Sequence, residues 1–409
     1  MFRTYDIRGK YGEDITPANF ARLGAAFSRF SNSLVMGMDY RSHNRGLARA
    51  FCSGFEREIR FAGVLPTPAI AFSCEKFGIC LTASHNPAEY NGAKPLKEKR
   101  PFFESDLAEL KKAFESTPQK TPELKQLPEI DGSLVESYIS ALPAFSDRVI
   151  YDLGGGAVCS LKHLFPESIY NEPDPAYARH DPEPKESALG ELKRATKQRG
   201  ALGFAFDGDG DRVMAVDSGV VIDGGITLAF ACLNHLPKNS RVMVTLDVSD
   251  EVFRFLEDSG FQASYSKVGD MFLIKHALGK HIDFAGERSG HYSFFKHQLY
   301  SDGPYCAALL SEHSPGELLE FSREFKNTTL IEQQFVTVDF KKLEQMLRDK
   351  APDALETIDG VKARFDDYCI LIRASNTEPK IRINVEAESR EKALAGMSFA
   401  KKIVAASKV

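Results

Sequence analysis

The feature of the sequence that most constrains its fold is the alternation of strand-like and helix-like segments over residues 1–325. The first stretch has apolar strand patterns at 2–7, 33–38 and 78–82, and an amphipathic helix pattern at 105–115. Strands that alternate with helices are typical of parallel βαβ units. The pattern therefore predicts an α/β fold for most of the chain.

Two further stretches follow the same pattern. The second begins with a strand pattern at 148–151 and ends before the polar segment Pro237–Ser240, which is typical of a linker. The third opens with a strand pattern at 241–246 and a helix pattern at 250–258. At about 150 residues per domain, the 409 residues of the chain allow two to four domains.

The last part of the chain has a different pattern. Strand patterns at 368–373 and 380–386 flank a polar turn, and a helix pattern follows at 390–405. In the second strand Ile381, Ile383 and Val385 alternate with polar residues, as in a sheet with one face in water. An α+β ending is therefore expected. The four predicted domains cover 1–142, 143–237, 238–325 and 326–409.

Composition excludes several classes of protein. The formal charge is 52 − 57 = −5, whereas proteins that attract nucleic acid through general phosphate contacts are usually basic. No apolar run approaches the roughly 18 to 20 residues that span a bilayer, and no signal peptide is visible at the N-terminus. The seven cysteines are scattered without a Cys-x-x-Cys pair, which favours buried, reduced thiols in a cytoplasmic protein.

The most specific local motif is Asp207-Gly208-Asp209-Gly210-Asp211-Arg212. Three carboxylates at alternate positions can fold onto one hard cation, and oxygen-only ligands suit Mg²⁺ or Ca²⁺. The motif is not an EF-hand, because Arg212 stands where Gly is needed and Ser218 where Glu is needed. A solvated acidic turn is the weaker interpretation, since three carboxylates so close together repel each other. Strand patterns at 203–206 and 213–216 place the motif at a strand end.

A second motif is Thr82-Ala83-Ser84-His85-Asn86-Pro87, which follows an apolar strand pattern. A serine at a strand-end turn can act as a nucleophile or a phosphate carrier. The segment is not the Gly-x-Ser-x-Gly elbow of serine hydrolases, and the adjacent His85 would not normally act as a triad base. Taken alone, an Asn-Pro turn is more often only a turn.

Two further motifs are weaker in isolation. Gly286-Glu287-Arg288-Ser289-Gly290-His291 places a carboxylate, a hydroxyl and an imidazole between glycines, a set that suits recognition of vicinal sugar hydroxyls. Arg373-Ala374-Ser375-Asn376-Thr377-Glu378-Pro379 lies between the two C-terminal strand patterns. An arginine with clustered hydroxyl and amide donors on a turn can hold a phosphate dianion.

Together the four motifs resemble the α-D-phosphohexomutase superfamily, and they occur in the order of that family. Shorter segments agree, at Tyr5–Gly9, Gly37–Arg41, Leu65–Pro68 and Tyr90–Lys94. The resemblance covers essentially the whole chain. It implies an α/β protein in which three related α/β domains with mixed sheets and a smaller C-terminal α+β domain surround a central cleft.

The resemblance also implies roles for individual residues. Ser84 would be the active-site phosphoserine, and its phosphoryl oxygen would complete a Mg²⁺ site with Asp207, Asp209 and Asp211. The phosphoryl group would pass to the free hydroxyl of a hexose monophosphate and give a hexose 1,6-bisphosphate, which would also serve as the activator.

Other residues are implied around that centre. Arg8, Lys94 and Arg212 would stabilise charge on the transferring group. Lys94 or His85 would move the proton of the sugar hydroxyl, with Lys94 preferred. The residues implied in substrate binding are Tyr5, Arg212, Glu287, Ser289, His291, Arg373, Ser375, Asn376 and Thr377.

Within the superfamily, Ser289-Gly290-His291 resembles both the phosphomannomutase/phosphoglucomutase branch and phosphoglucosamine mutase, whereas Asn376 and Thr82-Ala83 resemble the phosphomannomutase/phosphoglucomutase branch. Ser249 and Asp270 depart from the pattern of bacterial relatives, although Ser249 would serve as a helix cap. The alternatives are a phosphoglucosamine mutase, a catalytically idle sugar-phosphate-binding homologue, and a Mg²⁺ phosphatase. Small sugar phosphates are the expected partners, with neither nucleic acid nor membrane, and the chain is expected to be a monomer or a homodimer.

Overall fold

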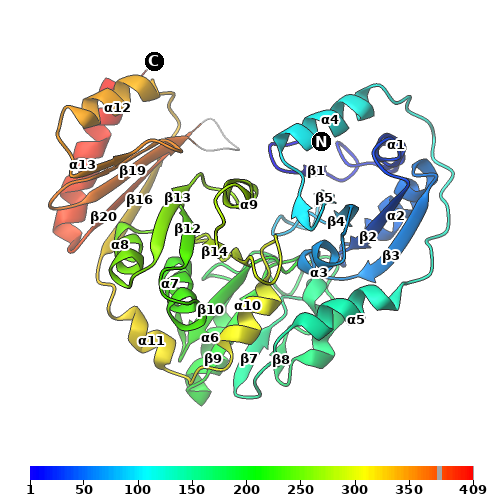
Figure 1. Ribbon diagram of the computed structural model, residues 1–409, viewed down its shortest axis with the longest axis horizontal. Helices are drawn as coiled ribbons and strands as arrows, with labels where there is room; N and C mark the ends of the chain where they lie inside the picture. Colours follow the sequence, from blue (N-terminus) through cyan, green and yellow to red (C-terminus); the bar gives the residue numbers. More distant parts are fainter. Residues whose placement is uncertain (375–379, 409) are drawn as a thin grey trace. The chain divides into compact units, whose positions relative to one another are not determined.

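The computed structural model describes residues 1–374 and 380–408. The chain divides into two compact units. The first unit contains residues 1–227 and 289–319, and the second contains residues 228–288 and 320–409. Figure 1 follows the chain through both units, and each is described by itself below.

The first sheet belongs to the first unit and is mixed. Its strand order is β1-β5-β4-β2-β3, and the short strand β6 pairs with β5. The strand pairs β1/β5 and β5/β4 are antiparallel, whereas β4/β2 and β2/β3 are parallel. The strands are β1 (Ile7–Lys10), β2 (Ser33–Met38), β3 (Glu58–Val64), β4 (Phe77–Leu81), β5 (Tyr90–Lys97) and β6 (Arg100–Pro101).

Helices cover both faces of this sheet. On one side lie α1 (Pro17–Phe27), α2 (Asn44–Gly54) and α4 (Glu104–Glu115), and on the other lie α3 (Thr67–Phe72) and α5 (Gly132–Ala141) (Figure 1). Helices α1 and α2 approach closely, since a Cβ atom on Gly24 would lie 2.2 Å from the carbonyl oxygen of Phe51. Phenylalanine dominates the core between the sheet and α1, α2 and α4, with Phe20, Phe27, Phe51, Phe55 and Phe102 fully or almost fully buried.

The second sheet, also in the first unit, repeats the arrangement of the first. Its order is β11-β10-β9-β7-β8, again with two antiparallel strand pairs followed by two parallel ones. Helix α6 (Gly190–Arg199) packs on it, as does α10 (Gly303–Leu310). The strands are β7 (Val149–Asp152), β8 (Ser168–Ile169), β9 (Leu202–Phe206), β10 (Val213–Asp217) and β11 (Val220–Val221). The 3₁₀ helix η1 (Ala157–Leu164) follows β7.

In the second unit, β12 (Arg241–Thr245) lies between two parallel partners, β13 (Gln262–Ser266) and β14 (Phe284–Gly286). Helix α8 (Asp250–Asp258) connects β12 to β13, and α9 (Asp270–Leu278) connects β13 to β14. The chain passes from one unit to the other within α7 (Gly224–His235) and within α11 (Glu317–Ser322). Strand β15 (Tyr292–Phe294) belongs to the first unit.

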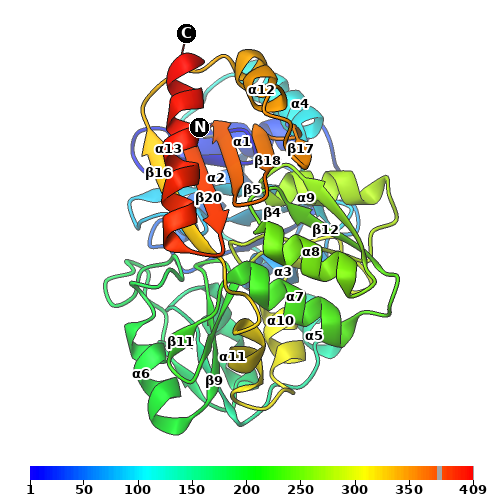
Figure 2. The ribbon, with the colours of Figure 1, turned by 90° about the vertical axis from the view of Figure 1, so that its left-hand side faces the viewer.

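The last sheet is entirely antiparallel and also belongs to the second unit. Its order is β16-β20-β19-β18-β17. Helix α13 lies along one face of the sheet, and α12 packs against α13 and β18 (Figure 2). The elements are β16 (Thr328–Gln334), α12 (Phe340–Arg348), β17 (Ala354–Glu356), β18 (Val361–Arg364), β19 (Cys369–Ala374), β20 (Ile381–Ala387) and α13 (Arg390–Ala406).

Side-chain caps fix where several helices begin. The hydroxyl of Thr16 accepts a hydrogen bond from the backbone N–H of Asn19 at the start of α1, and Ser389 does the same for Lys392 in α13. Ser249 accepts from the N–H of Val252 at 3.1 Å, which confirms that it caps α8. These caps satisfy backbone donors that the first helical turn leaves without a partner.

Most of the predicted elements are confirmed within one or two residues, including the helix at 250–258 and the strands at 33–38 and 241–246. The predicted strand at 2–7 is wrong, since β1 begins only at Ile7. The N–H of Arg3 donates to the carbonyl of Asp6 at 2.8 Å, so the preceding residues form a turn.

The predicted fold class, α/β with an α+β ending, is confirmed. Each of the four predicted domain segments contains its own set of strands: β1–β6, β7–β11, β12–β15 and β16–β20. The boundaries at 142/143, 237/238 and 325/326 stay predictions.

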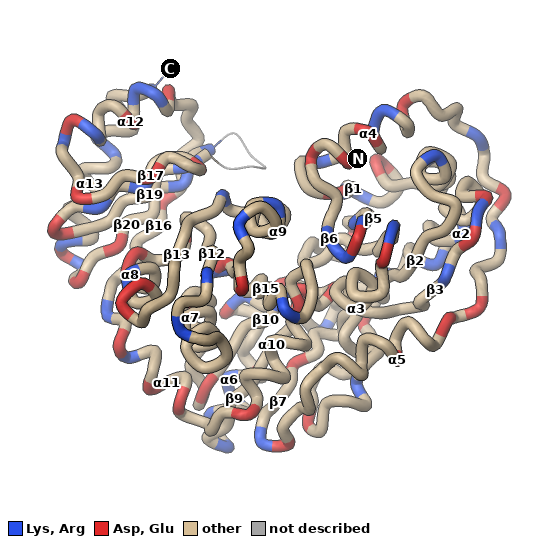
Figure 3. The backbone as a smooth tube through the Cα atoms, viewed as in Figure 1, with Lys and Arg blue, Asp and Glu red and all other residues tan. Residues whose placement is uncertain are grey.

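Charged residues of both signs are interspersed along the chain (Figure 3), without a long basic run of the kind that tracks a nucleic-acid backbone. Within the described residues, none of the helices combines the length and the apolar character needed to cross a lipid bilayer.

All seven cysteines are buried, as predicted, and none is in a disulfide. Burial raises the pKa of the Cys52 thiol to about 11, and the pKa values of Cys74 and Cys159 to about 12. The thiolate is the reactive form, so these groups should be inert in the folded chain.

We predict that Ellman's reagent at about pH 8 modifies no cysteine of the folded protein and seven after unfolding in guanidinium chloride. A Ser187→Cys variant, whose position is exposed, should add one fast-reacting thiol and so show that the reagent is competent. A fast-reacting thiol in the unmodified folded chain would contradict the burial described above.

Candidate functional site

The segment 207–212 connects β9 to β10, as the strand patterns on either side of the motif predicted. The carboxylates of Asp207, Asp209 and Asp211 are buried, with exposed fractions of 0%, 0% and 2%. Ligand oxygens from all three lie within 4.8 Å of one another. Carboxylate oxygens gathered in this way are typical ligands of hard divalent cations.

The electrostatics of this cluster fit a bound cation. Burial and the carboxylates of Asp211 and Asp209 raise the pKa of Asp207 to about 8. In the described structure, Oδ1 of Asp209 is buried and has no hydrogen-bond partner. A divalent cation would offset the clustered negative charge and also occupy this oxygen. Because all the donors are oxygens, the cluster fits Mg²⁺.

Lys94 lies against the same carboxylates. It stands on β5, and its Nζ is 2.7 Å from Oδ2 of Asp209 and 2.5 Å from Oδ2 of Asp211. Burial alone would lower the pKa of Lys94, but the two carboxylates raise it well above its usual value. The ammonium group therefore carries its charge at neutral pH and offsets part of the repulsion within the cluster.

Ser84 lies beside the cluster, in the connection between β4 and β5. Its Oγ donates to Oδ2 of Asp207 at 2.8 Å, and the side chain is buried. Its backbone has a φ of +50°, in the left-handed region that non-glycine residues rarely adopt. Such conformations persist only where the surroundings hold them, and they are concentrated at functional sites.

The loop that carries Ser84 between β4 and β5 (the serine loop) lies close to the 207–212 loop, the candidate metal loop. This close approach depends on Gly208. A Cβ atom at this position would lie 2.5 Å from the carbonyl oxygen of Ser84 and 2.7 Å from the hydroxyl of Tyr177. Both are too close for a real side chain. The glycine in the Asp-Gly-Asp-Gly-Asp motif thus allows the two loops to touch.

Thr67 is a member of this cluster that the sequence analysis did not assign. Its hydroxyl donates to Oδ2 of Asp209 at 2.5 Å, and its backbone N–H donates to the carbonyl of the same residue at 2.8 Å. Thr67 stands at the start of α3, inside the segment Leu65–Pro68 that contributed to the family resemblance. The signal was therefore present in the sequence, but it carried no role.

Arg8 and His85 lie near Ser84. Arg8 is on β1; its guanidinium pairs with Asp6 at 2.5 Å and donates to Oδ1 of Asn86. Nδ1 of His85 is 3.2 Å from Oγ of Ser84. The cation of Arg212, together with burial, lowers the pKa of His85 well below its usual value. The imidazole beside the serine is therefore neutral at neutral pH.

Arg212 and His291 complete the surroundings of the carboxylate cluster. Nε2 of His291 is 3.2 Å from both Nε of Arg212 and Oδ1 of Asp211. Nδ1 of His291 is 3.2 Å from the hydroxyl of Ser289. Burial would raise the pKa of Asp211, but Lys94, His291 and Arg212 hold it well below its usual range. Tyr5 lies in the turn before β1 and is partly exposed.

In the second unit, the carboxylate of Glu287 is buried just after β14. It accepts a hydrogen bond from the N–H of Gly269 at 2.6 Å, where the backbone has a φ of +129°. Asp359 accepts from the N–H of Val268 at 3.1 Å and lies 3.6 Å from Nε of Arg373. Asp359 therefore links the segment before α9 to the arginine of the C-terminal motif. Ser375, Asn376 and Thr377 lie outside the described residues.

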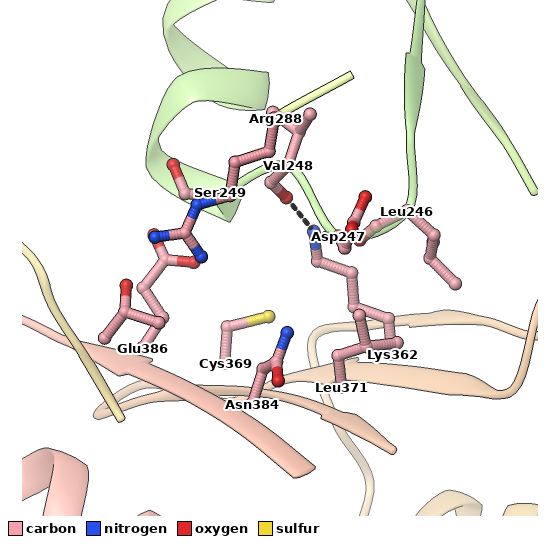
Figure 4. A pocket seen from close by; sticks show the side chains of 11 residues that line it. Leu246, Asp247, Val248, Ser249, Arg288, Lys362, Cys369, Leu371, Asn384 and Glu386 are labelled. Atoms are coloured by element: carbon pink, nitrogen blue, oxygen red, sulfur yellow. Dashed lines mark hydrogen bonds between the residues drawn. The ribbon is translucent and has the colours of Figure 1, made fainter. Parts of the chain in front are cut away.

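A small polar pocket lies in the second unit between the 246–249 segment and strands β18 to β20 (Figure 4). Lys362 reaches from β18 and donates to the carbonyls of Leu246 at 3.1 Å and Val248 at 2.7 Å. Asp247 lies between these carbonyls. Burial and the nearby Glu287 raise the pKa of Asp247. Lys362 thus links the loop after β12 to the last sheet.

The structure brings many of the predicted residues together within the first unit, namely Ser84, His85, Lys94, Asp207, Asp209, Asp211, Arg212, Ser289 and His291, with Arg8 alongside through Asn86. Glu287 and Arg373 belong to the second unit. Thr67, Asn86 and Asp359 hold site residues in place and were missed by the sequence analysis, because their roles depend on contacts with distant parts of the chain.

Comparison with known proteins identifies the family. Models of the phosphoglucomutase/phosphomannomutase family match along the chain: α/β/α domain I at 1–121, domain II at 148–220, domain III at 225–320, and the C-terminal domain at 333–399.

Individual relatives match over nearly their full length. A phosphomannomutase from Methanocaldococcus jannaschii is 30% identical, over 96% of this chain and 94% of its own. A probable phosphoglucosamine mutase from Methanopyrus kandleri is also 30% identical, over 96% and 95%. The crystal structure of a family protein from Burkholderia thailandensis, at 22% identity, superimposes with a TM-score of 0.87 over 99% of this chain and 96% of that one. The chain belongs to the phosphoglucomutase/phosphomannomutase family of phosphohexomutases.

Proposed function

We propose that this chain is a Mg²⁺-dependent phosphohexomutase that interconverts the 1-phosphates and 6-phosphates of mannose, glucose or both. Ser84 carries the phosphoryl group, and a hexose 1,6-bisphosphate is the intermediate. The observation that carries the proposal is the 2.8 Å contact between Oγ of Ser84 and Asp207, inside a buried cluster of three carboxylates. A phosphoryl acceptor and a cation site in contact are what phosphoryl transfer requires.

In the proposed reaction, the bond between Oγ of phosphorylated Ser84 and phosphorus breaks as phosphorus bonds to the free hydroxyl oxygen of a hexose monophosphate. The hydroxyl proton leaves to a base, the released Oγ of Ser84 takes up a proton, and the product is a hexose 1,6-bisphosphate. The reverse transfer then returns the other phosphoryl group to Ser84. Asp207, Asp209 and Asp211 would hold Mg²⁺ with a phosphoryl oxygen, and the bound ion would neutralise charge on the transferring group.

The side chains around Ser84 support this assignment. The ammonium of Lys94 contacts the carboxylate cluster, the guanidinium of Arg212 contacts His291 beside it, and Arg8 holds Asn86 two residues after the serine. His85 and Lys94 both stay candidates for the group that moves the proton. His85 contacts the serine oxygen itself, whereas Lys94 contacts Asp209 and Asp211.

The remaining site residues are proposed to bind the substrate. Glu287 and Ser289 would hold sugar hydroxyls that both orientations of the substrate share. Tyr5 and His291 would also bind the substrate. Arg373, with Ser375, Asn376 and Thr377, would hold the phosphate that is not reacting. The buried position of Arg373 beside Asp359 supports this, because an anchored guanidinium can make directed contacts to phosphate oxygens.

We predict that Ser84→Ala and Asp209→Ala each lower mutase kcat by more than about 1,000-fold while the chain stays folded. The first removes the phosphoryl carrier and the second removes a metal ligand. The measurement is a coupled assay of glucose 1-phosphate conversion, with circular dichroism to monitor folding. Ser73→Ala, a hydroxyl that bonds only a backbone carbonyl, should retain full activity. Activity in either site variant would overturn the assignment.

Metal binding can be tested without turnover. Because the three carboxylates converge on one point, Mn²⁺ should bind with a stoichiometry of one, seen by electron paramagnetic resonance, and Mg²⁺ should displace it. Asp209→Asn should weaken binding by at least about tenfold, since it removes a charged oxygen ligand. Asp106→Asn, at a mostly buried carboxylate paired with Arg100, serves as the matched control and should bind normally. Equal Mn²⁺ affinity in both variants would place the metal elsewhere.

Sugar preference is best resolved by side-by-side kinetics on mannose 1-phosphate, glucose 1-phosphate and glucosamine 1-phosphate. Mannose and glucose differ only at the 2-hydroxyl, so a site that holds the other hydroxyls should accept both. We expect their kcat/KM values to agree within about tenfold and to exceed that of glucosamine 1-phosphate.

A dominant rate on glucosamine 1-phosphate would instead make the chain a phosphoglucosamine mutase. The name of the Methanopyrus kandleri relative favours that second candidate. Asp270 directly follows Gly269, whose N–H donates to the proposed sugar-binding residue Glu287, and it therefore adds a carboxylate next to that contact.

A catalytically idle sugar-phosphate-binding protein and a Mg²⁺ phosphatase are separated from a mutase by mass spectrometry. Incubation with glucose 1,6-bisphosphate should add one phosphoryl group to Ser84. An idle protein would gain none. A phosphatase would lose the group to water faster than to a sugar phosphate, which release of inorganic phosphate would reveal.

A further inference from the structure

Arg41 is a fully buried arginine beside the serine loop, and neither the sequence motifs nor the proposed reaction assigns it a role. Its side chain has an exposed fraction of 0%. A buried guanidinium is costly unless every donor has a partner, since removal of its hydration is otherwise uncompensated. The partners of Arg41 therefore show what it does.

All five N–H donors of the guanidinium are used. Nε donates to Oδ2 of Asp39 at 3.2 Å. The other four hydrogen bonds go to backbone carbonyls of the loop between β4 and β5. Nη1 donates to Pro87 at 2.8 Å and Tyr90 at 3.0 Å, and Nη2 donates to Ser84 at 2.7 Å and Asn86 at 2.6 Å. The loop is thus wrapped around one planar cation.

A second chain of hydrogen bonds fixes the other side of Ser84. The backbone N–H of Ser84 donates to the hydroxyl of Thr82 at 2.8 Å, and that hydroxyl donates to Oδ2 of Asp39 at 2.7 Å. The same carboxylate oxygen accepts from Arg41. Both the N–H and the carbonyl of Ser84 are therefore tied to the Arg41–Asp39 pair, which holds the residue in its left-handed conformation.

Arg41 also faces the metal loop. Its guanidinium carbon lies 5.0 Å from the ring centroid of Tyr177, and the Tyr177 hydroxyl donates to the carbonyl of Gly208 at 3.4 Å. Gly208 stands between two of the clustered aspartates. One side chain thus contacts the serine loop directly and the metal loop through a single aromatic ring.

We propose that Arg41 is a positioning residue that fixes Oγ of Ser84 relative to the aspartate cluster, and that it thereby sets the rate of phosphoryl transfer rather than the affinity for the sugar phosphate. The inference rests on the proposed role of Ser84 as phosphoryl carrier. The guanidinium is enclosed by the loop and by Asp39, so it acts on the reaction only through the groups it holds.

The test compares two variants of the site with two control variants of the same chemical type. Arg41→Lys keeps the charge, but an ammonium has three donors and cannot serve five acceptors in a plane. Thr82→Val keeps the shape and removes the hydroxyl that links Ser84 to Asp39. The controls are Arg22→Lys and Thr117→Val. Arg22 also donates to backbone carbonyls and stacks on an aromatic ring, but it holds the turn at Thr117, which has no contact with the serine loop.

We expect Arg41→Lys and Thr82→Val to lower kcat for glucose 1-phosphate by about 10- to 100-fold, with KM within about twofold of the parent chain. The single-turnover rate of Ser84 phosphorylation by glucose 1,6-bisphosphate should fall by the same factor. Both controls should keep kcat and KM within about twofold, even where their Tm falls, because a loss of stability alone does not change turnover per folded molecule.

A kcat for Arg41→Lys within about twofold of the parent would overturn the proposal. If that variant does not fold, Thr82→Val decides by the same criterion. A parent chain that gains no phosphoryl group on Ser84 would instead overturn the proposed function, and the two failures are therefore distinguishable.

Discussion

The proximity of three buried carboxylates is the constraint on which the first unit depends. Like charges about 4 Å apart repel by roughly 4 kcal/mol at an effective dielectric constant of about 20. Asp207, Asp209 and Asp211 are tolerated together because cations and donors from other elements surround them. Lys94 comes from β5, and Thr67 comes from the start of α3. The metal loop of the second sheet is therefore held by residues of the first.

The same constraint explains why net charge was a poor guide to the ligand. A chain with a formal charge of −5 gives no sign of binding the sugar phosphates that are proposed as its substrates. The cations that matter are few and local: Arg8, Lys94 and Arg212 lie around Ser84 and the carboxylate cluster. Elsewhere charges of both signs are mixed along the chain, so the average conceals the site (Figure 3).

The sequence predicted what depends on local pattern. The amphipathic period identified α8, and Ser249 marked its start because capping is a contact within three residues. Alternating apolar residues identified β20. The strand predicted at 2–7 failed for a local reason, since the segment forms a turn that is closed by the hydrogen bond between Arg3 and Asp6.

Spacing alone predicted the site only where motifs were contiguous, and the family resemblance supplied residues such as Lys94. The aspartates lie in one loop, so their convergence followed from spacing. The contact between Lys94 and Asp211 joins residues 117 positions apart, and the five bonds of Arg41 depend on how the β4–β5 connection folds back on the chain. Tertiary packing decides such contacts, and no local pattern encodes them.

The positions of the reactive loops follow from the topology of the sheets. The first two sheets share the same sequence of antiparallel and parallel strand pairs, in which β5 corresponds to β10 and β4 to β9. The serine loop connects β4 to β5, and the metal loop connects β9 to β10, so the two loops are the same connection in two related sheets. Repetition of one strand order thus repeats one loop position, and the two loops carry different chemistry there: a hydroxyl in the first sheet and a set of carboxylates in the second.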